Sequence, residues 1–393
     1  MSTDSVVKKD GQPMRAKTKL RIVCVVGARP NFMKIMPIMK AFAERAPEVE
    51  VRLVHTGQHY DVDMNDRFFG QLGIPAPDVS LEVGSGTHAQ QTAEVMVRFE
   101  PVIDECRPDA VLVVGDVNST LACALVAAKK GVRVVHVEAG LRSRDRTMPE
   151  EINRILTDQL SDRLYITEDD ALANLASEGI ASDKVMHAGN VMIDTLLANR
   201  ARAVPAIETL TSIVGANAQE WVEQGFGLLT MHRPSNVDDP AVLETLLGVL
   251  AEASDTLPIV FPMHPRTRSK IAEFGLDRML DRPRIALLGP LGYLEMLGLT
   301  CAARVVLTDS GGLQEETTAL GVPCLTLREN TERPVTIHEG TNRLVGRDPE
   351  AIREGIRIAL MQDRSTAARP HNWDGCASQR IVEDLVAWAS AGQ

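Results

Sequence analysis

Aromatic side chains make up only 4% of the 393 residues, and no run of the chain reaches the length of a membrane helix. Positive charge is also scarce, because 53 acidic residues outnumber 42 basic ones and leave a formal net charge of −11. This balance argues against nucleic acid or an anionic membrane as a partner. It still permits a small anionic ligand, because a local cluster of cations can dominate the field inside a cleft.

Metal-type and disulfide-type cysteine patterns are missing as well. The six cysteines form no CxxC pair, and most stand in apolar runs, so we expect buried, reduced thiols and a cytoplasmic protein. Residues 1–18 are polar and contain no apolar signal-peptide stretch. We expect them to form a disordered tail.

Short β-branched runs alternate with helical segments along both halves of the chain. Residues 19–27, "KLRIVCVVG", and 109–116, "DAVLVVGD", are typical of strands buried on both faces of a parallel sheet. The length favours two domains. We therefore predict an α/β protein with two doubly wound, Rossmann-like domains at 19–190 and 191–372. The last helix, in 373–393, is predicted to pack back on the first domain.

Acidic residues follow two predicted strands of the first half. In an open parallel sheet, ligands bind at the carboxyl ends of the strands, which is where Asp116 and Glu138 stand. Glu150 and Glu151 follow a dozen residues after Glu138. Carboxylates in a cleft are suited to proton transfer, and close packing would raise the pKa of at least one of them. The alternative for Asp116 is an N-cap of the helix from about Ser119.

A strand-to-helix turn, "GARPNFMK" at 27–34, brings cations to a helix start. Gly27 permits a tight turn, and Arg29 and Lys34 would favour an anion there. The alternative is two surface cations on an ordinary helix. Neither a Walker A loop nor GxGxxG is present, which disfavours a nicotinamide cofactor.

The second half contains a glycine pair after a strand, in "TDSGGLQEE" at 308–316. Ser310, Gly311 and Gly312 would let backbone N–H groups approach a diphosphate. Glu316, with Glu315 as the alternative, would accept hydrogen bonds from ribose hydroxyls. A capped helix with ordinary acids in its first turns is the structural alternative.

Histidine and arginine mark two further strand ends of the second half, "TMHRPSN" and "MHPRTR". His232, His264 and Arg266 there predict an anion-binding cradle. The spacing lacks HxxxH, HExxH and a nearby cysteine ligand, so we expect no metal site. In the first half, Gln58 and His59 of "TGQHYD" either bind a ligand, such as a regulatory one, or only form a turn.

With these residues in view, the chain resembles the non-hydrolysing UDP-N-acetylglucosamine 2-epimerases. The shared motifs lie in one order between about residues 20 and 350, and they include "GARPNFMK", "GDVNSTLA", "HVEAGLRS", "MPEEINR", "TMHRPSN", "LTDSGGLQEE" and "TERPVTIHEGTNRLVG". The resemblance implies two Rossmann-like domains of the GT-B type with the nucleotide sugar between them. It also implies interconversion of UDP-GlcNAc and UDP-ManNAc, with no NAD or metal, through 2-acetamidoglucal and UDP.

The resemblance also implies roles for residues that match the family's motifs. The acid/base carboxylates would be Asp116, Glu138 and Glu150, and His232 would stand near the diphosphate. The residues implied to bind or support the substrate are Arg29, Lys34, Arg142, Ser310, Gly311, Gly312, Glu316 and Arg333. A homodimer is the family tendency.

One position departs from many bacterial members, which have a glutamine three residues after the one matching Gln58 and bind a second, activating UDP-GlcNAc there. Asp61 stands at this position, and an acid would repel a second diphosphate. The substrate could also be a modified UDP-HexNAc, such as a 2,3-diacetamido-glucuronate. A GT-B glycosyltransferase and a hydrolysing epimerase are the remaining alternatives.

Overall fold

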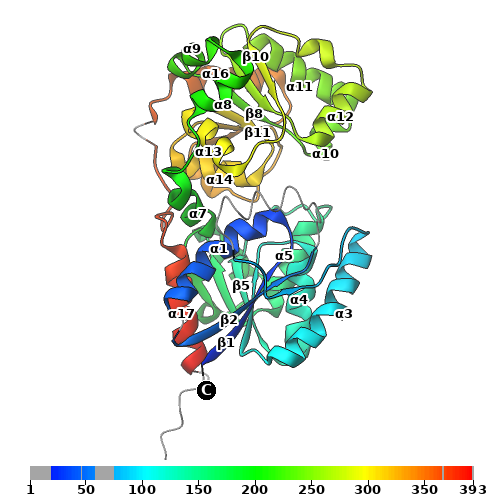
Figure 1. The fold of residues 1–393 in the computed structure, drawn as a ribbon, viewed down its shortest axis with the longest axis vertical. Coiled ribbons are helices and arrows are strands. Elements are labelled where there is room, and N and C mark those ends of the chain that lie inside the picture. The colour runs from blue at the N-terminus through cyan, green and yellow to red at the C-terminus, as the bar shows by residue number, and fades with distance from the viewer. Residues whose placement is uncertain (1–18, 46, 58–74, 365–366, 392–393) are drawn as a thin grey trace, which may run out of the picture.

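The computed structural model describes residues 19–45, 47–57, 75–364 and 367–391. Within these ranges the chain forms two α/β domains that lie end to end, each with helices on both faces of a parallel sheet (Figure 1). The predicted fold class is therefore confirmed. Gln58, His59 and Asp61 lie outside the described residues, as does the predicted N-terminal tail.

The first sheet has the strand order β3-β2-β1-β4-β5-β6-β7. Its strands are β1 (Leu20–Val26), β2 (Val49–His55), β3 (Val79–Ser80), β4 (Ala110–Val114), β5 (Arg133–Ala139), β6 (Arg163–Ile166) and β7 (Val185–His187). The helices of this part of the chain are α1 (Arg29–Glu44), α3 (His88–Cys106), α4 (Asn118–Lys129), α5 (Pro149–Leu160), α6 (Asp169–Ser177) and α7 (Val191–Arg200).

The second sheet has the order β10-β9-β8-β11-β12-β13. Its strands are β8 (Gly227–Thr230), β9 (Ile259–Pro262), β10 (Ile285–Leu288), β11 (Val305–Thr308), β12 (Cys324–Thr326) and β13 (Asn342–Leu344). The helices that follow α7 are α8 (Ala206–Val214), α9 (Asn217–Gln224), α10 (Pro234–Val237), α11 (Pro240–Ala253), α12 (Pro265–Glu273), α13 (Tyr293–Ala302), α14 (Gly311–Leu320), α15 (Val335–His338), α16 (Pro349–Met361) and α17 (Ala377–Ala391).

Each sheet reverses its strand order once, between β1 and β4 in the first domain and between β8 and β11 in the second. Such a reversal separates the loops that leave neighbouring strands and opens a crevice at their carboxyl ends. Most of the residues predicted to carry the chemistry stand at the ends of these four strands and of β5, whereas His264 and Arg266 follow β9 and Arg333 follows β12. The topology therefore gives each domain its own half of a site.

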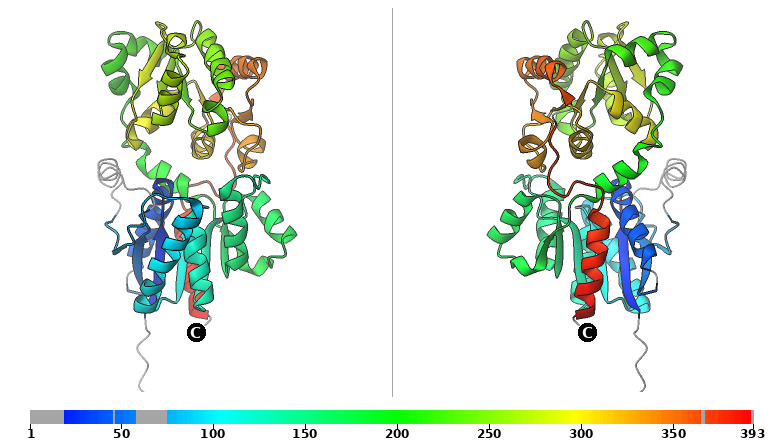
Figure 2. Two further views of the ribbon diagram at one scale, coloured as in Figure 1. Left: turned by 90° about the vertical axis from the view of Figure 1, so that its right-hand side faces the viewer. Right: turned by 90° about the vertical axis from the view of Figure 1, so that its left-hand side faces the viewer.

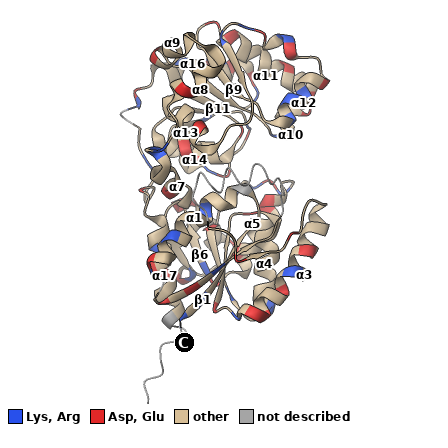
Figure 3. Ribbon diagram, in the orientation of Figure 1, with Lys and Arg blue, Asp and Glu red and all other residues tan. Residues whose placement is uncertain are grey.

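The strands form because their side chains are apolar on both faces. All five residues of β4 are buried, as expected for a central parallel strand covered by helices on both sides. Most charged side chains lie on helices and connecting loops (Figure 3). Of the six cysteines, all free thiols, Cys24, Cys123 and Cys324 are buried but Cys376 is exposed, so the expectation of buried thiols was wrong there.

Two helices tie the domains together. Helix α7 lies between them, where Ile193 packs in one apolar cluster with Leu297 of α13, and Thr195 Oγ1 donates to the Met33 carbonyl of α1 at 2.6 Å. After α16, the chain returns to the first domain as α17, which lies alongside α1 (Figure 2). The Asp194 carboxylate accepts the first backbone N–H groups of α17, at 3.1 Å from Ala377 and 2.7 Å from Ser378.

Candidate active site

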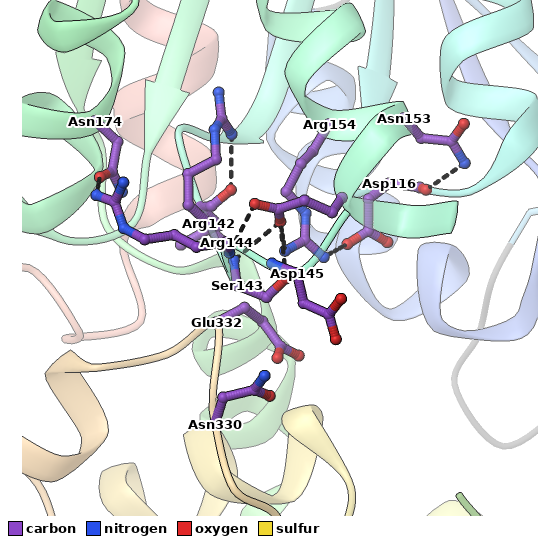
Figure 4. Close-up of polar contacts among 12 residues, drawn as sticks. Asp116, Arg142, Ser143, Arg144, Asp145, Asn153, Arg154, Asn174, Asn330 and Glu332 are labelled. Carbon is purple, nitrogen blue, oxygen red and sulfur yellow. Dashed lines mark hydrogen bonds and ion pairs between the residues drawn. The ribbon is translucent and has the colours of Figure 1, made fainter. Parts of the chain in front are cut away.

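The turn after β4 presents Asp116 near three basic side chains. Arg154 of α5 donates to Asp116 Oδ2 at 2.5 Å, and the Asp116 side chain is 25% exposed (Figure 4). Burial alone would raise the pKa of Asp116, but the positive charges of Arg154, Lys34 and Arg333 hold it below the ordinary value. Helix α4 begins at Asn118 without a side-chain cap, so the N-cap alternative for Asp116 is not adopted. Asp116 is thus an ionised carboxylate at neutral pH.

Glu138 leaves the sheet through a local irregularity of β5. The pairing of β5 with β6 shifts register between Val137 and Ala139, and Glu138 has a φ of 73°, in the left-handed region that side chains seldom adopt. Backbone strain of this kind costs about 1–3 kcal/mol and concentrates at functional sites. The carboxylate is buried and forms ion pairs with Lys34 of α1 and with Arg333.

The two acids at the start of α5 have different surroundings. Glu151 is buried and accepts hydrogen bonds from Ser143 N, Ser143 Oγ, Arg144 N and Arg154 at 2.8–3.0 Å, which fixes the loop after β5. Glu150 is half-buried and has no hydrogen bond or ion pair to the described residues. Glu151 is therefore committed to structure, and Glu150 keeps its carboxylate available.

In the second domain, Asp309 orients the loop after β8. It is fully buried and accepts from the backbone N–H groups of His232 and Arg233, both at 2.9 Å, and from His232 Nδ1 at 3.0 Å. Burial would raise the pKa of Asp309, but the bonds from His232 hold it below its ordinary value. His232 is thus fixed through one ring nitrogen, while 38% of its side chain remains exposed.

The remaining strand-end cations of this domain differ in their partners. The His264 ring lies 5.5 Å from that of His232, and burial together with the charge of His232 lowers the pKa of His264. The Arg266 guanidinium forms an ion pair with Asp238. In the first domain, Arg142 is likewise paired, with Asp158 at 2.7 Å and Glu178 at 2.6 Å. Neither arginine is a free cation in this structure.

The turn after β11 leads directly into α14, as the sequence predicted. Ser310 is the N-cap residue, but its side chain makes no capping hydrogen bond. A Cβ on Gly311 would lie 2.7 Å from Glu332 Oε1, so a larger residue there would require the Glu332 carboxylate to shift. The Glu332 carboxylate itself is paired with Arg328 at 2.7 Å. In Figure 4, Glu332 lies next to the loop of Ser143 from the other domain.

On α14, the neighbouring acids Glu315 and Glu316 are both buried but have different partners. Glu315 accepts from Asn190 at 2.8 Å and from Arg333 at 2.6 Å. Glu316 makes no hydrogen bond or ion pair with the described residues, and burial, reinforced by the charge of Glu315, raises its pKa to about 8. The predicted preference for Glu316 as the ribose acceptor is consistent with this arrangement and stays a prediction.

Arg333 joins the two halves. Its guanidinium contacts Glu138 of the first domain and Glu315 of the second, and the side chain is buried. The other carboxylate oxygen of Glu138 forms an ion pair with Lys34. Arg29 begins α1, but its side chain is outside the described set.

Sequence reasoning missed Arg154, Glu151 and Asp309 as positioning residues. The pair of Glu151 and Arg154 stands at i and i+3 on one helix, a spacing that brings side chains together and was visible in "MPEEINR". The partnership of Asp309 with His232 joins residues 77 positions apart, and no local pattern signals it. The described residues contain no group of three or more His, Cys, Asp or Glu side chains that could hold a metal ion.

Comparison with known proteins first defines the structural class. A sucrose-phosphate synthase from Thermosynechococcus elongatus, 14% identical, superposes with a TM-score of 0.58 over 95% of this chain and 96% of its own, which shows the shared two-domain fold alone. The chain is also similar to Methanocaldococcus jannaschii UDP-GlcNAc 2-epimerase in complex with UDP-GlcNAc and UDP. That structure is 39% identical, with a TM-score of 0.82 over 94% of this chain and all of that one.

The sequence comparisons then give the family. A family model described as UDP-N-acetylglucosamine 2-epimerase matches residues 41–386. A UDP-2,3-diacetamido-2,3-dideoxy-D-glucuronate 2-epimerase from Pseudomonas aeruginosa is 42% identical over 93% of this chain and 99% of its own length. The chain belongs to the UDP-N-acetylglucosamine 2-epimerase family, so the resemblance is confirmed and the protein is an isomerase. Among the described residues, none of the helices combines the length and apolarity that a membrane crossing requires.

Proposed function

We propose that the protein interconverts UDP-GlcNAc and UDP-ManNAc by inverting C2 of the sugar. The observation that carries this proposal is the bridge by Arg333. Arg333 links Glu138 of the first domain to Glu315 on α14 of the second. Glu138 is carried by β5, which lies next to β4, the strand before Asp116. The first turn of α14 has the form of a diphosphate site. Proton-transfer groups and a leaving-group site thus meet between the domains.

The proposed reaction begins with removal of the C2 proton by a carboxylate. The C–H electrons form the C1–C2 double bond as the C1–O bond breaks, giving 2-acetamidoglucal and UDP. Asp116, which is ionised because three cations lower its pKa, is suited to act as a base. UDP then adds back to C1 while a proton is delivered to the opposite face of C2, with Glu138 and Glu150 as the other acid/base groups.

The second domain would stabilise the departing diphosphate. The backbone N–H groups at Ser310, Gly311 and Gly312 open α14 and would bind its oxygens, and His232 would face the breaking C–O bond. Lys34 and Arg29 come from the first turns of α1 on the opposite side. Glu316 would accept hydrogen bonds from the ribose.

A modified substrate is the second candidate, because the Pseudomonas aeruginosa relative named for a diacetamido-glucuronate is 42% identical and matched over nearly its whole length. The same elimination would apply, since only C1 and C2 react. Side chains around C3 and C6 of the sugar would distinguish the two substrates.

Incubation with each UDP-sugar in deuterated water, followed by NMR, tests both candidates. Deuterium at C2 together with the 2-epimer of UDP-GlcNAc supports the first proposal. Exchange restricted to the diacetamido-glucuronate supports the second. Free sugar and UDP would instead indicate a hydrolysing enzyme, and no exchange without an acceptor would favour a glycosyltransferase.

We also propose that the protein acts as a homodimer in the cytoplasm. The free thiols are compatible with a reducing compartment. Light scattering after size-exclusion chromatography would contradict the dimer if the mass equalled one 42.8 kDa chain.

A further inference from the structure

Glu168 is a buried carboxyl group near the site that none of the steps above uses. It follows β6, directly beside the strand that carries Glu138, and precedes α6 as its N-cap residue. Only 3% of the residue is exposed, and its Oε2 has no hydrogen-bond partner among the described residues. A buried carboxylate without such partners is costly, so its protonation state matters.

The charges around Glu168 are already balanced without it. Lys34, Glu138, Arg333 and Glu315 alternate as cation and anion in one chain of ion pairs. A third carboxylate in the same buried region would therefore be an uncompensated negative charge, which folded proteins avoid by keeping the proton.

The charged groups around Glu168 come from three elements and one loop. Burial raises its pKa most; Arg333, before α15, acts in the opposite direction, while Glu315 on α14, Asp170 on α6 and Glu138 at the end of β5 raise it further. The net result is a pKa of about 8. Glu168 is thus neutral at pH 7 and ionises on the alkaline side.

Arg333 is the cation that acts on Glu168, and its buried Nη1 has no hydrogen-bond partner within the described ranges. We propose that Glu168 is a positioning residue of the active site that holds a proton at neutral pH and so leaves Arg333 bound to Glu138 and Glu315. Ionised Glu168 would attract Arg333 and loosen its hold on Glu138. The kinetic part of this inference rests on the proposed function.

The kinetic test compares the pH dependence of kcat in the wild type with that of Glu168→Gln, which keeps the shape of the neutral acid. We expect wild-type kcat to fall above about pH 8, by about tenfold for each further pH unit, as for loss of one proton. Glu168→Gln should keep kcat at pH 7 within about threefold and move the alkaline limb up by about one pH unit or more. Asp170→Asn removes an exposed acid of the same helix whose charge raises the pKa of Glu168, so this variant should keep the alkaline limb and move it slightly to lower pH, opposite to the shift expected for Glu168→Gln.

Two results would overturn the proposal. One is an alkaline limb that Glu168→Gln leaves unchanged. The other is a loss of about 100-fold or more in kcat at pH 7 in a folded Glu168→Gln protein, which would make ionised Glu168 a catalytic group. If the glutamine variant does not fold, Glu168→Asp keeps an ionisable group and should keep an alkaline limb with a shifted midpoint.

Infrared spectroscopy provides a readout that needs no substrate. At pH 7 we expect carboxylic-acid C=O absorption from both Glu168 and Glu316, with Glu168→Gln removing one contribution and Glu316→Gln removing the other. Absorption unchanged by Glu168→Gln would reject the protonated state even if the enzyme is fully active. Loss of that absorption in a protein without epimerase activity would reject the proposed function alone.

Discussion

The two domains share a topology but differ in the charge state of the carboxyl groups near their strand ends. At the strand ends of the first domain, the carboxylates of Asp116 and Glu138 are ion-paired with Arg154, Lys34 and Arg333. The second domain keeps Glu316 neutral by burial and offers the open first turn of α14 to an anion. One topology thus carries paired carboxylates on one side of the proposed site and an uncapped helix start on the other, because strand ends accept either kind of side chain.

The sharpest way to break this division is Asp116→Asn, which removes a proton acceptor but keeps a hydrogen-bonding group for Arg154. Loss of a general base should lower kcat by about 10²–10⁴-fold. Binding of the UDP-sugar, measured by calorimetry, should be retained because the nucleotide is proposed to bind to the second domain. Asp104→Asn, on the exposed face of α3, is the control; near-normal turnover in Asp116→Asn would rule out the acid/base role.

Arg333→Ala should lower the free energy of unfolding by removing the ion pairs that link the two domains. It leaves Glu138 and Glu315 without their shared cation, and removal of one partner from a buried ion pair costs about 3–5 kcal/mol in free energy of unfolding. Urea unfolding would measure this loss. Arg353→Ala breaks exposed ion pairs with Glu252 and Glu350 and should leave stability unchanged. Equal effects of the two substitutions would contradict the bridge.

Glu316→Gln tests the neutral acid of the second domain. In the unfolded chain Glu316 ionises near its ordinary pKa of 4.5, whereas the folded protein holds the proton until about pH 8. The folded state therefore binds more protons between these values, and stability falls as the pH rises through this window. Glu316→Gln should remove this contribution, on the order of 4 kcal/mol at pH 9 relative to pH 5. Exposed Glu223→Gln should leave the pH slope unchanged, and a wild-type slope in Glu316→Gln would refute the buried neutral acid.

Asp309→Asn should have the smallest effect, because it weakens the orientation of His232 without removing a reacting group. Loss of a charged hydrogen bond, about 1.5–3 kcal/mol, corresponds to about a 10–150-fold fall in kcat/KM. The low pKa of Asp309 stabilises the folded state above its ordinary pKa of 3.8, and that contribution is lost as the pH falls. Asp309→Asn should therefore show less acid destabilisation than the wild type. A kcat/KM within about twofold of the wild type would remove Asp309 from the positioning of His232.

Much of the fold could be predicted because its signals are local. The apolar runs that became β1 and β4, and the glycine pair that opens α14, form their elements through neighbouring residues. The family was also within reach, because its motifs keep one order along the chain. Whether Asp116 caps a helix or stands as a paired carboxylate could not be decided from neighbouring residues. The outcome depends on Arg154, which approaches Asp116 from α5.

The sequence by itself determined that acids stand at the carboxyl ends of β4 and β5 and that a glycine pair follows β11. These positions depend only on where each strand stops. Only the tertiary structure decided which of Glu150 and Glu151, and of Glu315 and Glu316, has a carboxyl group without a partner among the described residues. Adjacent residues on a helix point about 100° apart, so the packing of the helix selects between them. It also decided that Arg333 meets Glu138, 195 residues away, because their contact requires both domains to be folded and joined.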